Sequence, residues 1–200
     1  LATLAGTPRV RVLLYDQPFN FSAINNYAAQ AAEGEVLCLL NNDTEVISPD
    51  WLEEMLGHLI QQDVGVVGAK LLYPDGRVQH GGDAVGPGGC AGHLHAMIDS
   101  DAPGYCDRAL LAQELSAVTA ACLLTWKHLY RRLGGLDDRH LKVAFNDVDY
   151  CLRVERLGLK TEVVAWQGAD EHLPAAPGWR RGVDAALIEK RLREDAARSI

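Results

Sequence analysis

Apolar and polar positions along this chain of 200 residues fall into blocks that predict strands and helices in turn. The nearly continuous apolar run at 35–40 is typical of a parallel strand buried on both faces, and polar residues follow it abruptly at Asn41. Between positions 51 and 59, apolar residues recur at helical spacing. The dipeptide Ser48-Pro49 predicts the start of that helix, because proline is favoured at a first helical position.

The other blocks continue the same alternation. Further strands are expected at 10–15, 64–72, 117–126 and 160–165, and further helices from Ser22 to about Ala32, from Asn146 to Leu157 and from Val183 to Ala197. The glycine-rich stretch 81–104 predicts a long loop or a set of short strands, a kind of segment that often carries function. Together these blocks favour an α/β fold with a mostly parallel sheet flanked by helices.

Composition narrows the classes of protein. Hydrophobic residues make up 48% and charged residues 23%, as in soluble globular domains. The net charge of −8 disfavours binding to a phosphate backbone and so argues against nucleic acid, although a divalent cation can still hold an anionic nucleotide. No apolar run reaches the ~20 residues of a membrane span, and no leader peptide opens the chain, so we expect a cytoplasmic protein.

Five cysteines are present, and they form no CxxC pair. Most of them lie in apolar stretches, so we expect reduced thiols in the core of a cytosolic protein, with a nucleophilic cysteine as the less favoured reading. They are Cys38, Cys90, Cys106, Cys122 and Cys151.

The segment Asn41-Asn42-Asp43-Thr44-Glu45 is the first candidate for chemistry. In open α/β sheets, ligands bind beyond the carboxyl ends of strands, and Asn and Asp deliver oxygen ligands there that suit Mg²⁺ or Mn²⁺ bound to phosphates. The alternative is an Asx-turn that caps the following helix. On the residues alone, these two readings are about even.

A second candidate surrounds Asp147 and Asp149, in the first turn of the helix expected from Asn146. The helix dipole stabilises carboxylates there, which explains both without a function. An aspartate beside the apolar Phe145 at a pocket edge could also act as a general base. Arg153 lies four residues after Asp149, and a helical ion pair is the favoured reading of those two residues.

The histidines give weaker signals. His172 follows two acidic residues and could bind a divalent metal, but a solvated loop histidine is the more common case. His93 and His95 would share one face of a strand, which is a weak metal signal without a third ligand. His80 precedes Gly81-Gly82 and fits a site or a turn about equally.

The order of these features resembles the family 2 glycosyltransferases of the GT-A fold, especially their bacterial rhamnosyltransferase-like branch. The resemblance covers roughly Arg9 to His172. It rests on Phe19-Asn20, Asn25-Asn26, Gly34-Glu35-Val36, LLNNDTEV, VGAKLLYPDGRVQHGG (which ends at Gly82), AVTAACLLT (117–125), GGLD (134–137) and FNDVDYCLR (145–153).

The resemblance implies roles for individual residues. The family's Asp-x-Asp motif falls on 41–43, so Asp43 is implied to bind Mn²⁺ or Mg²⁺, while Asn41, Asn42 and Asn26 contact the donor diphosphate. The catalytic acidic motif falls on Asn146-Asp147, which implies Asp147 as the general base. His172 matches a late metal or diphosphate contact, although the chain departs from the family pattern in the residues that follow it. The residues implied for the acceptor and sugar are Thr119, Ala120, Asp137, Asp149, Arg153 and His80.

The resemblance also implies an inverting, metal-dependent transfer of a sugar from a nucleotide-diphospho-sugar to a saccharide or lipid-linked saccharide acceptor, in cell-surface polysaccharide synthesis. Family members begin with two further βα units that bind the nucleotide base, and this chain is expected to lack them. We therefore expect a partial domain at 1–182 and a C-terminal helix at 183–200. Other parts of a parent protein would hold it at the inner face of the plasma membrane. The strand at 10–15 would lack its usual neighbours and is expected to pair in a homodimer.

Two alternatives stay open at this point. One is a non-catalytic module on the same scaffold that binds carbohydrate or protein. The other is a nucleotidyltransferase or phosphatase that uses Asp43 with a metal. A nucleotidyltransferase should show a glycine-rich phosphate loop near its first strand, and none is present. An aspartyl-phosphatase would need an Asp-x-Asp pair, which Asn41 interrupts.

Overall fold

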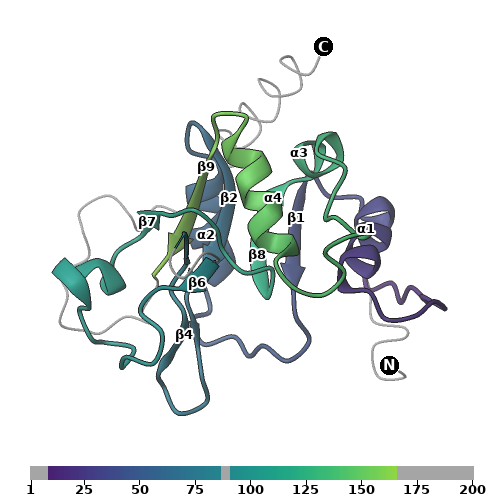
Figure 1. The fold of residues 1–200 in the computed structure, drawn as a ribbon. Coiled ribbons are helices and arrows are strands. Elements are labelled where there is room, and N and C mark those ends of the chain that lie inside the picture. Colours follow the sequence, from purple (N-terminus) through teal and green to yellow (C-terminus); the bar gives the residue numbers. More distant parts are fainter. Residues whose placement is uncertain (1–8, 87–90, 166–200) are drawn as a thin grey trace.

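A computed structural model describes residues 9–86 and 91–165 of the chain (Figure 1). Its centre is a five-stranded sheet in the order β1-β8-β2-β9-β7. The strands are β1 (Val36–Leu40), β8 (Cys122–Trp126), β2 (Val64–Ala69), β9 (Lys160–Val164) and β7 (Gln113–Glu114). This arrangement confirms the α/β class with a central sheet flanked by helices.

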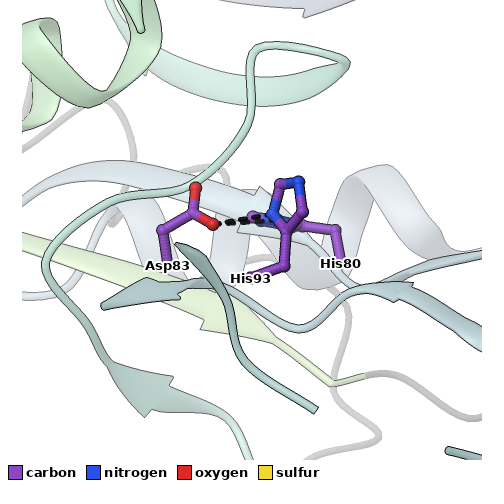
Figure 2. A group of neighbouring side chains, drawn as sticks. All are labelled: His80, Asp83 and His93. Carbon is purple, nitrogen blue, oxygen red and sulfur yellow. Dashed lines mark hydrogen bonds and ion pairs between the residues drawn. The ribbon is translucent and has the colours of Figure 1, made fainter. Parts of the chain in front are cut away.

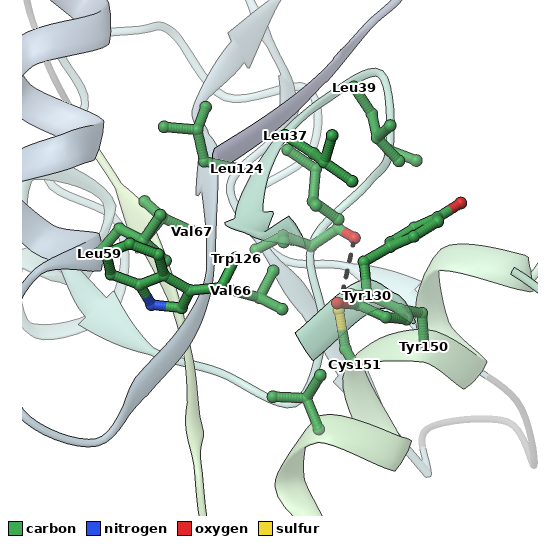
Figure 3. Close-up of a cluster of buried hydrophobic side chains, with 14 of the residues drawn as sticks. Leu37, Leu39, Leu59, Val66, Val67, Leu124, Trp126, Tyr130, Tyr150 and Cys151 are labelled. Carbon is green, nitrogen blue, oxygen red and sulfur yellow. Dashed lines mark hydrogen bonds between the residues drawn. The ribbon is translucent and has the colours of Figure 1, made fainter. Parts of the chain in front are cut away.

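Helices α2 (Trp51–Leu59) and α4 (Asn146–Glu155) both pack on β2 and β9. Figure 3 shows their side chains meeting the strands from opposite sides, with Leu59 beside Val67 on one side and Tyr150 beside Val66 on the other. Burying apolar side chains on both faces of a sheet is the main source of stability in such a fold. Helices α1 (Phe21–Ala31) and α3 (Lys127–Arg132) lie beside the β1 and β8 end of the sheet (Figure 1).

The glycine-rich region forms short strands, as one of the two predicted outcomes. Within the stretch 81–104, β5 (Asp83–Val85) pairs antiparallel with β6 (Ala91–His93). Just before it, β3 (Leu71–Leu72) pairs antiparallel with β4 (Val78–His80). The chain then passes through a 3₁₀ segment, η2 (Tyr105–Leu110), before it rejoins the main sheet at β7. Both small sheets contact the segment that precedes β8, through a bridge between Asp83 and Ala117 and a hydrogen bond between His80 and Thr119, and the site described below is built there.

The prediction of a mostly parallel sheet is wrong in its detail. β8 runs antiparallel to both of its neighbours, β1 and β2, and β7 is antiparallel to β9, so β2 and β9 are the one parallel neighbouring pair among the described residues. β1 stands at one edge of this sheet. It is not buried on both faces, because Leu37 and Leu39 are buried while Cys38 and Leu40 are exposed.

The predicted strand at 10–15 is also wrong, since these residues form no strand. A strand needs a neighbour for its N–H and C=O groups, and this stretch instead runs beside α1. Arg11 bonds the carbonyl of Ala31 and pairs with Glu33, while Tyr15 meets Tyr27 with ring centroids 6.0 Å apart. Without an open strand edge at 10–15, the homodimer prediction loses its basis.

Three predicted element starts shift. Asn20, not Ser22, caps α1, because its side-chain oxygen accepts from the Ala23 N–H at 3.0 Å, while the buried Ser22 hydroxyl donates to the carbonyl of Leu141. Helix α2 begins after Asp50 rather than at Ser48-Pro49. The strand expected from 117 is regular only from Cys122.

Two of the thiols are buried as predicted, Cys122 and Cys151, but Cys38 and Cys106 are exposed. Cys90, the predicted helix at 183–197 and His172 lie outside the described residues, and the division into 1–182 and 183–200 stays a prediction. Within the described part of the chain, no helix combines the length and apolarity that crossing a membrane requires.

Candidate active site

The turn at Asn41–Thr44 stands at the carboxyl end of β1. The Asn41 N–H donates to the carbonyl of Ala121 at 2.9 Å, which extends the β1–β8 pairing by one residue. The N–H and the hydroxyl of Thr44 then both donate to the carbonyl of Asn41, at 3.4 and 2.6 Å, and close the turn. Asn42 and Asp43 are left exposed at its tip.

This turn does not cap the next helix. The N-cap of α2 is Asp50, well beyond the turn, and it makes no capping hydrogen bond through its side chain. The structural alternative for the segment was a cap for that helix, and the structure excludes it. The exposed carboxylate of Asp43 therefore lies beyond the carboxyl end of a strand, which is where ligands bind in open α/β sheets.

Asp147 lies in the first turn of α4, and its carboxylate faces the chain segment that precedes β8. One oxygen, Oδ2, accepts from the Ala120 N–H at 3.1 Å, and the other, Oδ1, accepts from the Val148 N–H at 2.9 Å. Two backbone donors thus fix the orientation of this carboxylate. Phe145, just before α4, has φ of 60° and is exposed, so the helix begins at a sharp change of chain direction.

The central segment, Thr119–Ala121, connects three of the predicted regions. The Thr119 N–H donates to Nε2 of His80 at 3.2 Å, the Ala120 N–H donates to Asp147, and the Ala121 carbonyl accepts from Asn41. Three consecutive residues therefore bring together side chains and turns that are as far apart in sequence as Asn41 and Asp147.

His80 belongs to a cluster with Asp83 and His93 (Figure 2). Nδ1 of His93 lies 2.7 Å from Oδ1 of Asp83 and 2.9 Å from Nδ1 of His80. Burial, together with the neighbouring His93, lowers the pKa of His80 to about 3. Burial also raises the pKa of Asp83, an effect that His93 opposes and nearby Asp147 reinforces.

Sequence reasoning missed Asp83 and misplaced His93. The expected strand face shared by His93 and His95 is wrong, because β6 ends at His93 and His95 has φ of 59°. The pairing of β5 with β6 instead puts His93 opposite Asp83. The signal that could have found Asp83 is its spacing from His80, across a glycine pair that lets the chain turn sharply: Gly82 has φ of 90°, and a Cβ there would lie 1.9 Å from Leu115.

Other predicted contacts are engaged inside the protein. The Asn26 amide donates to the carbonyl of Leu136 at 2.8 Å and to Asp138, and its oxygen accepts from the Tyr130 hydroxyl and from the Leu136 N–H. This amide has no donor or acceptor to spare. Its geometry favours a structural role at the glycine turn, which we define as Gly134–Leu136.

Arg153 also holds the glycine turn. It pairs with Asp149 at 2.8 Å, as the helical spacing predicted, and donates to the carbonyls of Leu133 and Gly135, each at 2.8 Å. Asp137 accepts from the N–H groups of Arg139 and His140 and pairs with the His140 ring at 3.0 Å. These bonds, led by that from the His140 N–H, lower the pKa of Asp137 to about 2.

Comparison with known proteins adds evidence from outside the structure. The sequence pattern described as Glycosyl transferase family 2 matches residues 1–84. The chain is 46% identical, over 85% of its length, to an uncharacterized protein of Sinorhizobium fredii named y4gI, and 37% identical, over 85% of its length, to the O-antigen biosynthesis protein RfbC of Myxococcus xanthus. It spans 19% of the first relative and 14% of the second. These matches confirm the resemblance to the family 2 glycosyltransferases, and the rhamnosyltransferase-like branch stays a prediction.

Proposed function

Since this chain belongs to the family 2 glycosyltransferases, we propose that it carries the diphosphate and catalytic-base parts of an inverting glycosyltransferase site. The reaction is transfer of a sugar from a nucleotide-diphospho-sugar to a saccharide or lipid-linked saccharide acceptor, in cell-surface polysaccharide synthesis. One observation carries the proposal: the Thr119–Ala121 segment bonds the turn that presents Asp43 on one side and the Asp147 carboxylate on the other. The name of the RfbC relative supports the polysaccharide context.

Asp43 is proposed to bind Mg²⁺ or Mn²⁺ together with the donor diphosphate. Its side chain is exposed, and it is not part of any three-ligand cluster among the described residues. A site with one carboxylate fits such an ion, because Mg²⁺ is commonly held by one or two carboxylates while substrate phosphates and water complete its shell. When bound, the ion supplies positive charge at the leaving group. Asn41 and Asn42 would contact the same diphosphate from the turn.

Asp147 is proposed as the general base. Its two hydrogen bonds from Ala120 and Val148 orient the carboxylate and still leave lone pairs for an acceptor hydroxyl. As the acceptor oxygen attacks the anomeric carbon from the face opposite the diphosphate, its proton passes to Asp147. Thr119 and Ala120 would line the approach of the sugar, because their backbone already touches both His80 and Asp147.

The test is calorimetric titration of the full-length protein with nucleoside diphosphates, with and without Mn²⁺. Asp43→Ala is expected to remove the metal-dependent part of the binding, because the ion then loses its carboxylate ligand. The control is Glu45→Ala, which removes another exposed carboxylate two residues away. Binding that stays metal-dependent and equally strong in Asp43→Ala would show that Asp43 is not the ligand.

A further inference from the structure

The cluster of His80, Asp83 and His93 has no part in the proposed chemistry, yet three potential metal ligands converge there (Figure 2). We propose that these three side chains bind one divalent transition-metal ion of the zinc class, at a site separate from the ion proposed at Asp43.

The three ligand atoms lie close enough together to surround one ion. His80 ends β4, Asp83 begins β5 and His93 ends β6, so three strands each supply one ligand. The distances between the ligand atoms are 2.7 Å (His93 to Asp83), 2.9 Å (His93 to His80) and 3.8 Å (His80 to Asp83). Around a tetrahedral Zn²⁺ with bonds of about 2.0–2.1 Å, ligand atoms stand about 3.3 Å apart. The three distances measured in the cluster lie on both sides of that separation.

Hydrogen bonding alone does not account for the cluster. The Thr119 N–H donates to Nε2 of His80, so a neutral His80 carries its proton on Nδ1 and directs it at Nδ1 of His93. The His93 nitrogen must then accept with its single lone pair, which leaves it no proton for Asp83 at 2.7 Å. If the proton moves to Nδ1 of His93 instead, two N–H groups face each other.

Protonating Asp83 does not remove the conflict either. Its hydroxyl and the Nδ1–H of His80 would both need the one lone pair of His93. As long as His80 accepts from the Thr119 N–H, no placement of protons satisfies the short contacts among these three side chains. A cation in the middle meets the contacts among the side chains at once, because both Nδ1 lone pairs and the Asp83 oxygen can then point at it. The cost is the 3.2 Å contact from Thr119, since a His80 that ligates through Nδ1 carries its proton on Nε2.

The ligand set indicates the class of ion. Imidazole nitrogen suits zinc and its neighbours among the transition metals, whereas Mg²⁺ prefers oxygen. His80 and Asp83 are almost fully buried, while the His93 side chain is 51% exposed and leaves the cluster open to solvent on one side. Three protein ligands with one open position form a common zinc arrangement, in which water or a substrate atom supplies the fourth ligand.

Binding of an ion at this cluster would affect the proposed base, Asp147, through the backbone of Thr119. Loss of the Thr119 contact frees the N–H next to Ala120, which holds Asp147. We therefore expect the Thr119 amide resonance to shift on addition of Zn²⁺, a response that an ion bound elsewhere on the surface would not give.

The experiment titrates the full chain with Zn²⁺ after removal of metal by chelation and measures affinity by calorimetry. The expected result is one Zn²⁺ per chain, bound more tightly than Mn²⁺ or Mg²⁺, with affinity reduced roughly 100-fold or more in His93→Ala. His93 is half exposed, so the variant should keep its fold, which circular dichroism checks. Asp83→Asn, which keeps the side-chain shape, should also weaken binding.

Two control variants separate this site from the rest of the molecule. His140→Ala removes a histidine that also pairs with an aspartate, Asp137, but lies outside the cluster, and it should leave Zn²⁺ binding unchanged. Asp43→Ala should also leave it unchanged. The inference is overturned if the unmodified chain binds no Zn²⁺, if it prefers Mn²⁺ or Mg²⁺, or if His93→Ala binds Zn²⁺ as tightly. If Asp43→Ala lost Zn²⁺ binding while His93→Ala kept it, the inference would be overturned and the proposed function would stand.

Discussion

The central segment at Thr119–Ala121 and the glycine turn at Gly134–Leu136 both gather polar residues that the family motifs marked as site residues. At the central segment, the Asp147 carboxylate and the Asp43 turn are held through backbone bonds, while Asp43 itself stays exposed. At the glycine turn, the side-chain amide of Asn26 is fully used inside the protein, and Arg153 donates to the carbonyls of Leu133 and Gly135. A motif match identifies both regions as site residues. Their hydrogen bonds distinguish the region that is free to bind a ligand from the one that is already satisfied inside the protein.

The largest effect expected from this contrast is on turnover. Asp147→Asn in the full-length protein should lower the rate of sugar transfer by about 10²–10⁴-fold, because an amide cannot take the acceptor proton. The rate is measured as release of nucleoside diphosphate from the donor nucleotide-sugar. The amide oxygen can still accept from the Ala120 N–H, so the fold should persist. The measurement is steady-state turnover across a panel of nucleotide-diphospho-sugars.

The matched control for that variant is Asp149→Asn, on the same helix two residues away. Asp149 pairs with Arg153 and belongs to the bonds of the glycine turn. This change should cost stability by about 0.5 kcal/mol, as expected for a helical ion pair at the surface, and leave turnover within a few-fold of the unmodified protein. Equal losses of turnover in both variants would remove Asp147 from its proposed role.

An intermediate effect is expected when one asparagine is removed from each region. Asn26→Ala should reduce the free energy of unfolding by roughly 2–3 kcal/mol, because it leaves the Leu136 N–H and the Tyr130 hydroxyl without their partner. Asn42→Ala removes an exposed side chain and should change stability by less than about 0.5 kcal/mol. Urea unfolding of both variants measures this difference.

The same pair tests ligand binding in the opposite sense. Asn42→Ala should weaken Mn²⁺-dependent binding of nucleoside diphosphate, while Asn26→Ala should leave it nearly unchanged at temperatures where the variant is folded. If Asn26→Ala weakened binding more than Asn42→Ala, the glycine turn would be part of the donor site after all.

The contrast also shows what a sequence can predict here. The run at 35–40, the polar break at Asn41 and the helix from Asn146 were readable because hydrophobic period and local propensity decide them. The sequence could not predict that every donor and acceptor of the Asn26 amide is used. Its partners lie 104 to 112 residues away, and only the packed fold brings them together. Position in a motif carries no information on whether an amide is already satisfied.

Two further misses have the same origin. The pairing of Asp83 with His93 depends on the register of the β5–β6 hairpin, which the spacing of the two residues does not fix. The strand expected at 10–15 had the right composition but no neighbour to bond with among the described residues, and its side chains turned to α1 instead. Strand propensity shows that a segment would fit into a sheet, but the segment forms a strand only if a neighbouring strand is there to bond with it.

The smallest effect expected concerns acid stability at the glycine turn. Hydrogen bonds from the N–H and the ring of His140, and from the N–H of Arg139, hold the pKa of Asp137 at about 2, below the ordinary 3.8 of an aspartate. A folded-state pKa below the unfolded one gives stability that is fully present above about pH 4 and is lost as pH falls toward 2. Asp137→Asn should therefore have a lower urea midpoint than the unmodified chain at pH 5, and the difference should become much smaller as pH falls to 2. Asp43→Asn makes the same change of charge at the exposed tip of the Asn41–Thr44 turn and serves as the control. A difference between Asp137→Asn and the unmodified chain that stays constant from pH 5 to pH 2 would mean that the shape of the side chain, and not its charge, supports the turn.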